Sequence, residues 1–324
     1  MQKLSKKAWL EIGIVSGIFV VLMIIAAFAD LAINKALYYP DSLFGQFFDK
    51  LGELPTYLAA PIAGAILYNQ EYVKGSKMAI FFKSVAAVCT FAGFLFAIKH
   101  WFWGNFISDE VTYEWVFSIF FSLLLTFSII AGMAGINKDV MKKLLIFAIF
   151  LIIIMAVTTI LIQILKYVWA RQRFRTMTTE NEDFAELLAI YGSNFEGFTP
   201  WYLPQSIFKL DLHTEEYVAA FNLIDDGSFK SFPSGHTAAA SAMFAMILLP
   251  DIFDNLNTKK YKWIFWTIPA IYTICVGFSR ILMGAHYLSD VVAGGFIGFG
   301  IVALTRYIIV SKGLHKKELL TLTK

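Results

Sequence analysis

Long apolar runs alternate with short polar connections along most of this chain. A helix that crosses a bilayer needs about 20 predominantly apolar residues. Eight runs approach or exceed that length, and the second of them is the shortest and contains a proline, Pro61. The pattern therefore predicts eight membrane-spanning helices, at Trp9–Ile33, Pro55–Tyr68, Val85–Phe102, Trp115–Ile136, Leu144–Leu165, Thr237–Phe253, Trp263–Phe278 and Leu288–Val310.

Lysines cluster in alternate connections, and their positions predict the orientation. The clusters are Lys3, Lys6 and Lys7; Lys74, Lys77 and Lys83; Lys138, Lys142 and Lys143; Lys259, Lys260 and Lys262; and Lys312, Lys316 and Lys317. With eight helices all five fall on one side, whereas a seven-helix count would distribute them over both faces. Cytoplasmic connections carry the excess of Lys and Arg. We therefore expect both termini in the cytoplasm of a multi-pass protein of the cell membrane.

Composition agrees with the membrane assignment. Of the 324 residues 58% are hydrophobic and 16% are charged, whereas soluble domains are about 45–50% apolar and about 25% charged. The formal net charge of +3 is too small to indicate a nucleic-acid partner. We expect membrane lipids as the surroundings, and the sequence predicts no oligomeric state.

One long polar segment interrupts the apolar pattern, between Lys166 and Pro233. It contains aromatic residues such as Trp201, Tyr202 and Phe229 among acidic ones. On the eight-helix count it faces outward, and we expect residues 174–230 to fold as an extracytoplasmic cap. A disordered loop is the alternative.

The string Pro233-Ser234-Gly235-His236 follows this segment. Pro233 ends any preceding helix and Ser234 is a good N-cap, so a helix is expected to begin here. A helix N-terminus offers free N–H groups and a partial positive charge that suit a phosphate, and Gly235 permits close approach of a ligand. Read alone, the string also fits an ordinary capped helix with an interfacial histidine.

A second string combines Ser279-Arg280 with His286 and Asp290. His286 and Asp290 are four residues apart and share one face of a helix. An Asp bonded to one ring nitrogen of a histidine leaves the other nitrogen free as a nucleophile. Arg280 offers a fork of donors for phosphate oxygens. The alternative is a structural His–Asp cap of the last helix.

Four cations, Lys166, Arg171, Arg173 and Arg175, follow the fifth span on the outward side. Charged residues at a helix end can simply extend to the interface. These four oppose the positive-inside trend, and an anionic ligand would explain them.

Together these strings resemble the three signatures of the type 2 phosphatidic acid phosphatase (PAP2) superfamily, K-x6-R-P, P-S-G-H and S-R-x5-H-x3-D. The second and third match letter for letter, and in the first Phe174 replaces the proline after Arg173. The resemblance covers residues 166–290 and implies an all-α membrane bundle with a six-helix core. Residues 1–78 are then expected to be a two-helix addition before a catalytic domain at 79–324.

The resemblance also implies roles for the site residues. His286 would attack phosphorus, Asp290 would orient it, and His236 would serve as acid and then base in a two-step transfer through a phosphohistidine. Lys166, Arg173, Ser234, Gly235 and Arg280 would bind the phosphate. No metal or other cofactor is implied.

The expected activity is hydrolysis of a lipid phosphate or diphosphate at the outer membrane face. Phosphatidic acid, phosphatidylglycerol phosphate and polyprenyl diphosphate all present the same phosphate, so the sequence leaves the substrate open. A phosphotransferase and a phosphatase for a soluble sugar phosphate would keep the same site. A phosphate-binding transporter without catalysis is the alternative from another class.

Overall fold

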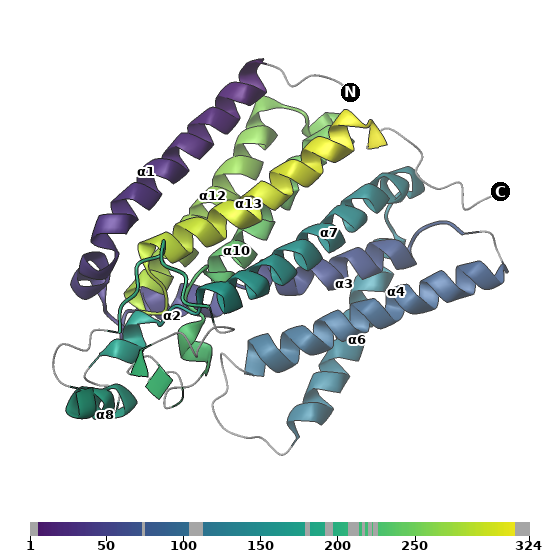
Figure 1. Cartoon of the computed structure of the whole chain (residues 1–324). Helices are drawn as coiled ribbons and strands as arrows, with labels where there is room; N and C mark the ends of the chain where they lie inside the picture. The colour runs from purple at the N-terminus through teal and green to yellow at the C-terminus, as the bar shows by residue number, and fades with distance from the viewer. Residues whose placement is uncertain are drawn as a thin grey trace.

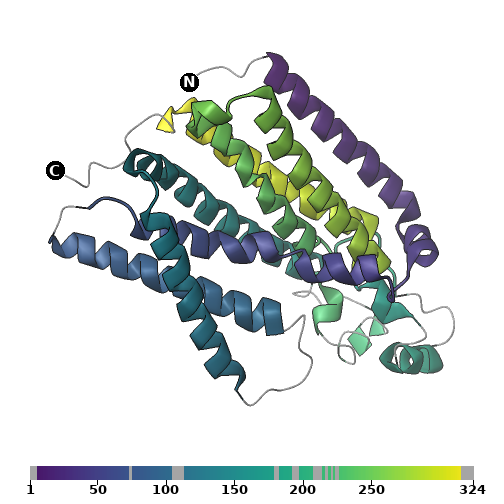
Figure 2. The same ribbon diagram turned by 180° about the vertical axis from the view of Figure 1, so that it is seen from behind.

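The computed structural model describes residues 6–72, 75–103, 113–178, 182–191, 197–206, 214–215, 218–219, 222 and 226–314. Every regular element in these ranges is helical. The long helices lie side by side in a bundle, with α1 on one flank and α4 and α6 on the other (Figures 1 and 2). They are α1 (Lys6–Leu37), α3 (Leu54–Tyr68), α4 (Lys77–Phe96), α6 (Glu114–Ala134), α7 (Lys138–Trp169), α12 (Lys259–Leu282) and α13 (Leu288–Ser311).

Shorter elements connect or continue these helices. A π-helical turn, η1 (Ala97–Trp103), extends α4, and one continuous path is formed by α10 (Gly235–Ser241), η5 (Ala242–Leu248) and α11 (Leu249–Ile252). The others are α2 (Leu43–Leu51), η2 (Phe174–Met177), α8 (Glu182–Tyr191), η4 (Asp226–Phe229) and η6 (Asp254–Leu256).

Seven segments in the described ranges are long and apolar enough to cross a membrane. A helix, α3, also forms at the second predicted segment, but it has only 15 residues, fewer than the roughly 20 of an ordinary span. The multi-pass helical fold is thus confirmed, while the count of eight spans stays a prediction.

The ends of the helices follow the lysine map. α1, α4, α7 and α12 begin at the same end of the bundle at which α13 ends (Figure 1). The lysine clusters within these described ends therefore lie together, whereas Lys3, Lys74, Lys316 and Lys317 lie outside the described residues. Which side of the membrane this end faces stays a prediction.

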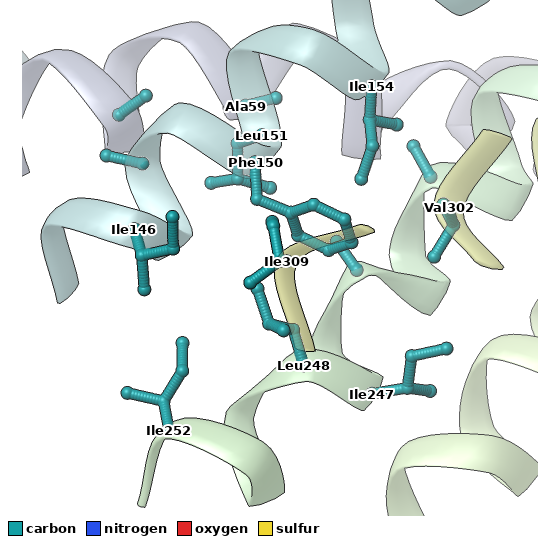
Figure 3. Packing of buried hydrophobic residues seen from close by; sticks show 14 of the residues in the cluster. Ala59, Ile146, Phe150, Leu151, Ile154, Ile247, Leu248, Ile252, Val302 and Ile309 are labelled. Carbon is teal, nitrogen blue, oxygen red and sulfur yellow. The ribbon is translucent and has the colours of Figure 1, made fainter. Parts of the chain in front are cut away.

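The apolar core lies between α3, α7, η5, α12 and α13. The ring of Phe150 on α7 points toward Leu248 and Ile309 (Figure 3) and is fully buried. Because lipid is as apolar as these side chains, close packing and not exclusion from water holds such helices together. This core lies toward the lysine-rich end, and the strings identified in the sequence lie at the other.

Small residues allow the closest helix contacts. A Cβ at Gly294 of α13 would lie 2.2 Å from the Ser234 carbonyl oxygen, and one at Gly298 would lie 2.6 Å from the Ala238 carbonyl oxygen. The small-residue face of α13 is therefore packed directly against the backbone of α10 and fixes its position.

The predicted division of the chain at residue 78 stays a prediction, but the packing groups the helices differently. α1 packs against α13, and α3 packs against α7. α4 and α6 pack against α3 and each other, on the side of the bundle away from α1 (Figures 1 and 2). The first helix is thus an integral part of the bundle that carries the two strings.

Candidate active site

The cationic segment begins where α7 ends. Lys166 lies in the last turn of α7, and Ala170 turns the chain with a left-handed backbone (φ 44°, ψ 43°). The next residues are fixed from two sides, because Ser231 N donates to the Arg171 carbonyl at 3.0 Å and Arg173 N donates to the Ser228 carbonyl at 2.8 Å. This turn brings the cations back beside the starts of α10 and α13.

Arg171 binds carboxylates of the protein itself. Its Nη1 donates to Asp290 Oδ1 and to Ser289 Oγ, each at 2.7 Å, and its Nη2 donates to Asp30 Oδ2 at 3.0 Å. The guanidinium also lies over the Tyr287 ring, 4.0 Å from its centroid. Arg171, Asp30 and Asp290 are all at least 98% buried. Arg171 therefore supports the start of α13 from inside the protein.

His286 is held by a backbone carbonyl, which corrects the expected direct bond to Asp290. Its Nδ1 lies 2.6 Å from the Ser231 carbonyl oxygen but 3.6 Å from Asp290 Oδ2. Because a carbonyl only accepts, Nδ1 carries the hydrogen and Nε2 of the neutral ring is left with its lone pair. Asp290 acts one step away, since Ser231 Oγ donates to its Oδ2 at 2.5 Å.

Three cations lie close enough to the His286 ring to affect its charge state. Burial, together with the charges of Arg173, Arg280 and Lys166, holds the pKa of His286 well below its ordinary value of 6.5. A neutral imidazole facing a cationic cradle is suited to attack an anion that the cradle binds. The predicted nucleophile and three of the predicted phosphate ligands are thus brought together.

Arg280 is presented by the end of α12. Its carbonyl accepts from Ala285 N at 3.0 Å and from His286 N at 3.2 Å, which ties it to the loop that carries His286. The side chain is buried, and its Nε has no hydrogen-bond partner among the described residues. Its Nη1 contacts Asp49 of α2. A buried guanidinium with an unused donor is a ready ligand for an anion.

Ser234, Gly235 and His236 form the expected helix start. Ser234 Oγ accepts from Thr237 N at 3.3 Å and from Thr237 Oγ1 at 3.0 Å, so the hydroxyl serves as the N-cap of α10. At Gly235 a Cβ would lie 3.2 Å from Lys166 Nζ, which leaves room for the ammonium beside the bare backbone. The predicted contacts of Ser234 and Gly235 with a phosphate stay predictions.

The residue in place of the motif proline preserves the local backbone. Arg173 has φ −79° and ψ 147°, the extended conformation that a following proline favours. Phe174 begins η2, and its buried ring meets the rings of Tyr38 and Tyr287 edge-on, at centroid distances of 5.3 and 6.5 Å. Packing of an aromatic ring here replaces the constraint of proline.

Part of the predicted cap lies within the described residues, and it packs against Arg171 and Tyr287. The Thr199 carbonyl accepts from Arg171 Nε at 2.7 Å, and the Phe198 ring lies 5.3 Å from the Tyr287 ring. Gln205 N donates to the Trp169 carbonyl at 3.0 Å. That residues 174–230 as a whole cover the site stays a prediction, since much of this range lies outside the described residues.

Sequence reasoning missed four polar residues of the N-terminal segment. Asp30 and Asn34 of α1 support the His286 loop, since Asp30 accepts from Ser289 N and Asn34 Nδ2 donates to the His286 carbonyl, at 3.0 and 3.1 Å. Asp49 contacts Arg280, and Glu53 lies beside His236. A carboxylate in an apolar span was a usable signal for Asp30, but chain order alone could not place the other three.

These observations define a multi-pass helical membrane protein with two histidines and a cluster of cations at one end of its bundle. The sequence profile of the PAP2 superfamily matches residues 144–313, more than half of the chain, and the protein belongs to that superfamily. The resemblance noted from the three signatures is thereby confirmed.

Similarity to individual curated proteins is confined to a shorter segment. Lipid A 1-phosphatase of Rhizobium johnstonii is 33% identical over 87 residues, which are 27% of this chain and 31% of that protein. Phosphatidylglycerophosphatase B of Bacillus subtilis is 32% identical over 76 residues, 24% of this chain and 37% of that protein. The matched segments span about a third of these relatives, and no solved structure matches the chain.

Proposed function

We propose that this protein is a membrane phosphatase that hydrolyses a lipid phosphate or diphosphate monoester. The observation that carries the proposal is the contact of His286 Nδ1 with the Ser231 carbonyl at 2.6 Å, which leaves Nε2 free in a ring that lies among the charges of Lys166, Arg173 and Arg280. A nucleophile with a free nitrogen and a set of cations for three phosphate oxygens is what phosphoryl transfer requires.

In the first step the Nε2 lone pair of His286 forms a bond to the terminal phosphorus, and the bond from that phosphorus to the leaving oxygen breaks; this oxygen is the ester oxygen of a lipid phosphate or the bridging oxygen of a lipid diphosphate. His236 gives its proton to that leaving oxygen. Lys166, Arg173 and Arg280 stabilise the charge that develops on the other oxygens, as preorganised donors do at such sites.

In the second step His236, now neutral, takes a proton from water while the water oxygen attacks phosphorus. The bond between phosphorus and Nε2 of His286 breaks, and inorganic phosphate leaves. The use of His236 first as acid and then as base restores the starting state. Because the cations supply the charge stabilisation, the proposed mechanism uses no metal.

An apolar groove with a volume of about 530 Å³ supports a lipid as the substrate. It lies between α1, α12 and α13, and its lining includes Phe19, Trp266, Ile274, Leu288 and Phe296. Thr237 also lines it, and the Thr237 hydroxyl bonds to Ser234 of the candidate site. A phosphate in the site would therefore place an attached hydrocarbon chain at the mouth of this groove. The names of the two relatives, both lipid phosphatases, agree.

We infer that the site faces the outer side of the membrane and that both termini are cytoplasmic. The support is the clustering of lysines at the opposite end of the bundle, since lysine-rich ends remain in the cytoplasm.

Phosphate release from lipids by the purified full chain tests the proposal. We expect release from long-chain phosphatidic acid, phosphatidylglycerol phosphate or polyprenyl diphosphate in excess EDTA, with ¹⁸O from labelled water in the phosphate. His286→Ala is expected to abolish it. Absence of release from all three lipids, or full activity of His286→Ala, would overturn the proposal, and unlabelled phosphate transferred to another lipid would indicate a phosphotransferase.

A further inference from the structure

The short helix α2 and the residues after it bring two carboxylates to the candidate site. Glu53 Oε1 lies 3.4 Å from His236 Nδ1, and Asp49 Oδ1 lies 3.9 Å from His236 Nε2. Gly52, between them, allows this approach, since a Cβ there would lie 3.2 Å from His236 Cδ2 and 2.9 Å from Val276 Cγ1. The chain therefore passes directly beside the His236 ring.

Glu53 is fixed by a second contact. The Tyr57 hydroxyl donates to Glu53 Oε2 at 2.9 Å, so one carboxylate oxygen is anchored and the other faces His236. Pro55, in the first turn of α3, constrains the backbone between them. Tyr57, Glu53 and His236 thus form a chain of contacts comparable to that of Asp290, Ser231 and His286.

The proposed chemistry assigns a role to the contact between Glu53 and His236. His236 must begin the reaction protonated, yet the cations that bind the phosphate oppose a further positive charge. Charged or titratable groups around it come from every neighbouring element: Asp49 and Glu53, Lys166, Arg173, Arg175, Arg280 and His286. A carboxylate close to an imidazole favours its protonated form.

We propose that Glu53 is a positioning residue for His236, an inference that rests on the proposed function. Its carboxylate accepts from Nδ1, which turns Nε2 toward the leaving oxygen and stabilises the imidazolium before the proton is given up. After the transfer Nδ1 keeps its hydrogen toward Glu53, and Nε2 has the lone pair that accepts the proton of the attacking water.

Asp49 does not fit this role. It lies near Nε2, the nitrogen that must reach the substrate, and it contacts Arg280. A bound phosphate would take the place of its carboxylate, because both are anions that pair with the same guanidinium.

The pH dependence of lipid phosphate hydrolysis by Glu53→Gln separates positioning from a structural role. We expect kcat to fall about tenfold, part of the effect of a general acid, with little change in KM. The alkaline limb of the profile is expected to move about one unit to lower pH, because the imidazolium loses its carboxylate. Tyr57→Phe should move it less in the same direction, and Glu53→Asp should restore part of the rate.

Glu71→Gln is the matched control, since it removes the same charge at the lysine-rich end, where Glu71 pairs with Lys138 and Lys142. A Glu53→Gln profile that superimposes on those of the wild type and of this control would overturn the proposal.

A measurement without turnover keeps this inference separate from the proposed function. In the full chain with ¹⁵N-labelled histidine, the His236 ring signals are assigned by their loss in His236→Asn. We expect the midpoint of their titration to lie at lower pH in Glu53→Gln than in the wild type. An unchanged midpoint overturns the role of Glu53. If the midpoint shifts but the protein hydrolyses none of the lipids, the contact between Glu53 and His236 is supported and the proposed phosphatase function is overturned.

Discussion

The guanidinium of Arg171 donates to the carboxylate of Asp290 at 2.7 Å, inside the protein and away from solvent. Arg171 belongs to the cluster of cations that the sequence associated with an anionic ligand, and its anions are Asp290 and Asp30. The network joins α1, the end of α7 and the start of α13. It fixes the loop that carries His286.

Loss of Arg171 should therefore destabilise the fold. Removing one partner of a buried ion pair leaves an uncompensated charge and costs about 3–5 kcal/mol. We expect Arg171→Ala to lower the temperature of thermal unfolding in detergent strongly. Arg306→Ala, which breaks a part-exposed pair with Asp251, should cost about 1 kcal/mol or less. A variant at Arg171 with normal stability and a raised KM would indicate instead that Arg171 binds substrate.

Replacement of Asp49 should strengthen anion binding. Its carboxylate contacts Arg280, so in the proposed function an incoming phosphate displaces it. We expect Asp49→Asn to tighten inhibition by orthovanadate about two- to fivefold, the range of a part-exposed ion pair. Arg280→Lys should weaken the same inhibition. Weaker inhibition of Asp49→Asn would mean that its carboxylate helps to hold the ligand.

The lowered pKa of His286 predicts that hydrolysis persists below pH 6.5. Burial and the charges of Arg173, Arg280 and Lys166 lower this pKa well below 6.5. The nucleophile must be neutral, and a lowered pKa keeps it neutral as the pH falls. We expect the acid limb of kcat/KM, which reports the free enzyme, to lie below pH 6.5. Lys166→Gln should move that limb upward, and an acid limb above 6.5 in the wild type would contradict the assignment.

The helices of the bundle could be predicted because each contains a long run of mostly apolar residues. Each of the eight predicted segments lies largely within helix, and α7 and α12 extend beyond the predicted bounds at both ends, by turns that mix basic and apolar residues. The strings around His236 and His286 were visible for the same reason, because each lies within one short stretch. Together with Lys166 and Arg173 they carry the resemblance to the family, and that resemblance implied that Lys166, Arg173 and Arg280 act at the same site as His286.

What the sequence could not provide is contact between distant segments. Asp30 is 260 residues from Asp290, and both bind Arg171. The direct bond expected between His286 and Asp290 followed from helical spacing, but His286 precedes α13 and its ring turns to the Ser231 carbonyl. Asp49 lies in the short helix α2 and Glu53 directly after it, outside all the predicted spans and strings.

The groove between α1, α12 and α13 predicts a selective effect on long-chain substrates. Thr273 lines it, whereas Ile271 lies on the same helix outside the lining and is exposed. We expect Thr273→Phe to raise KM for a long-chain lipid phosphate about tenfold, since small changes in apolar fit are worth at least that much. Hydrolysis of a short-chain ester should be unchanged. Ile271→Phe is the control, and equal effects of both variants would contradict the groove as the site of the chain.

Gly294 should tolerate no side chain, because a Cβ there would lie 2.2 Å from the Ser234 carbonyl oxygen. Helix α10 would have to move away from α13 and carry His236 with it. We expect Gly294→Ala to cost about 1–3 kcal/mol, as overpacking does, and to lower kcat. Gly300→Ala on the same helix meets nothing within 4 Å and should be neutral or stabilising by about 0.5–1 kcal/mol. Thermal unfolding and phosphate release of the two variants test this, and equal behaviour would mean that α10 is not fixed by α13.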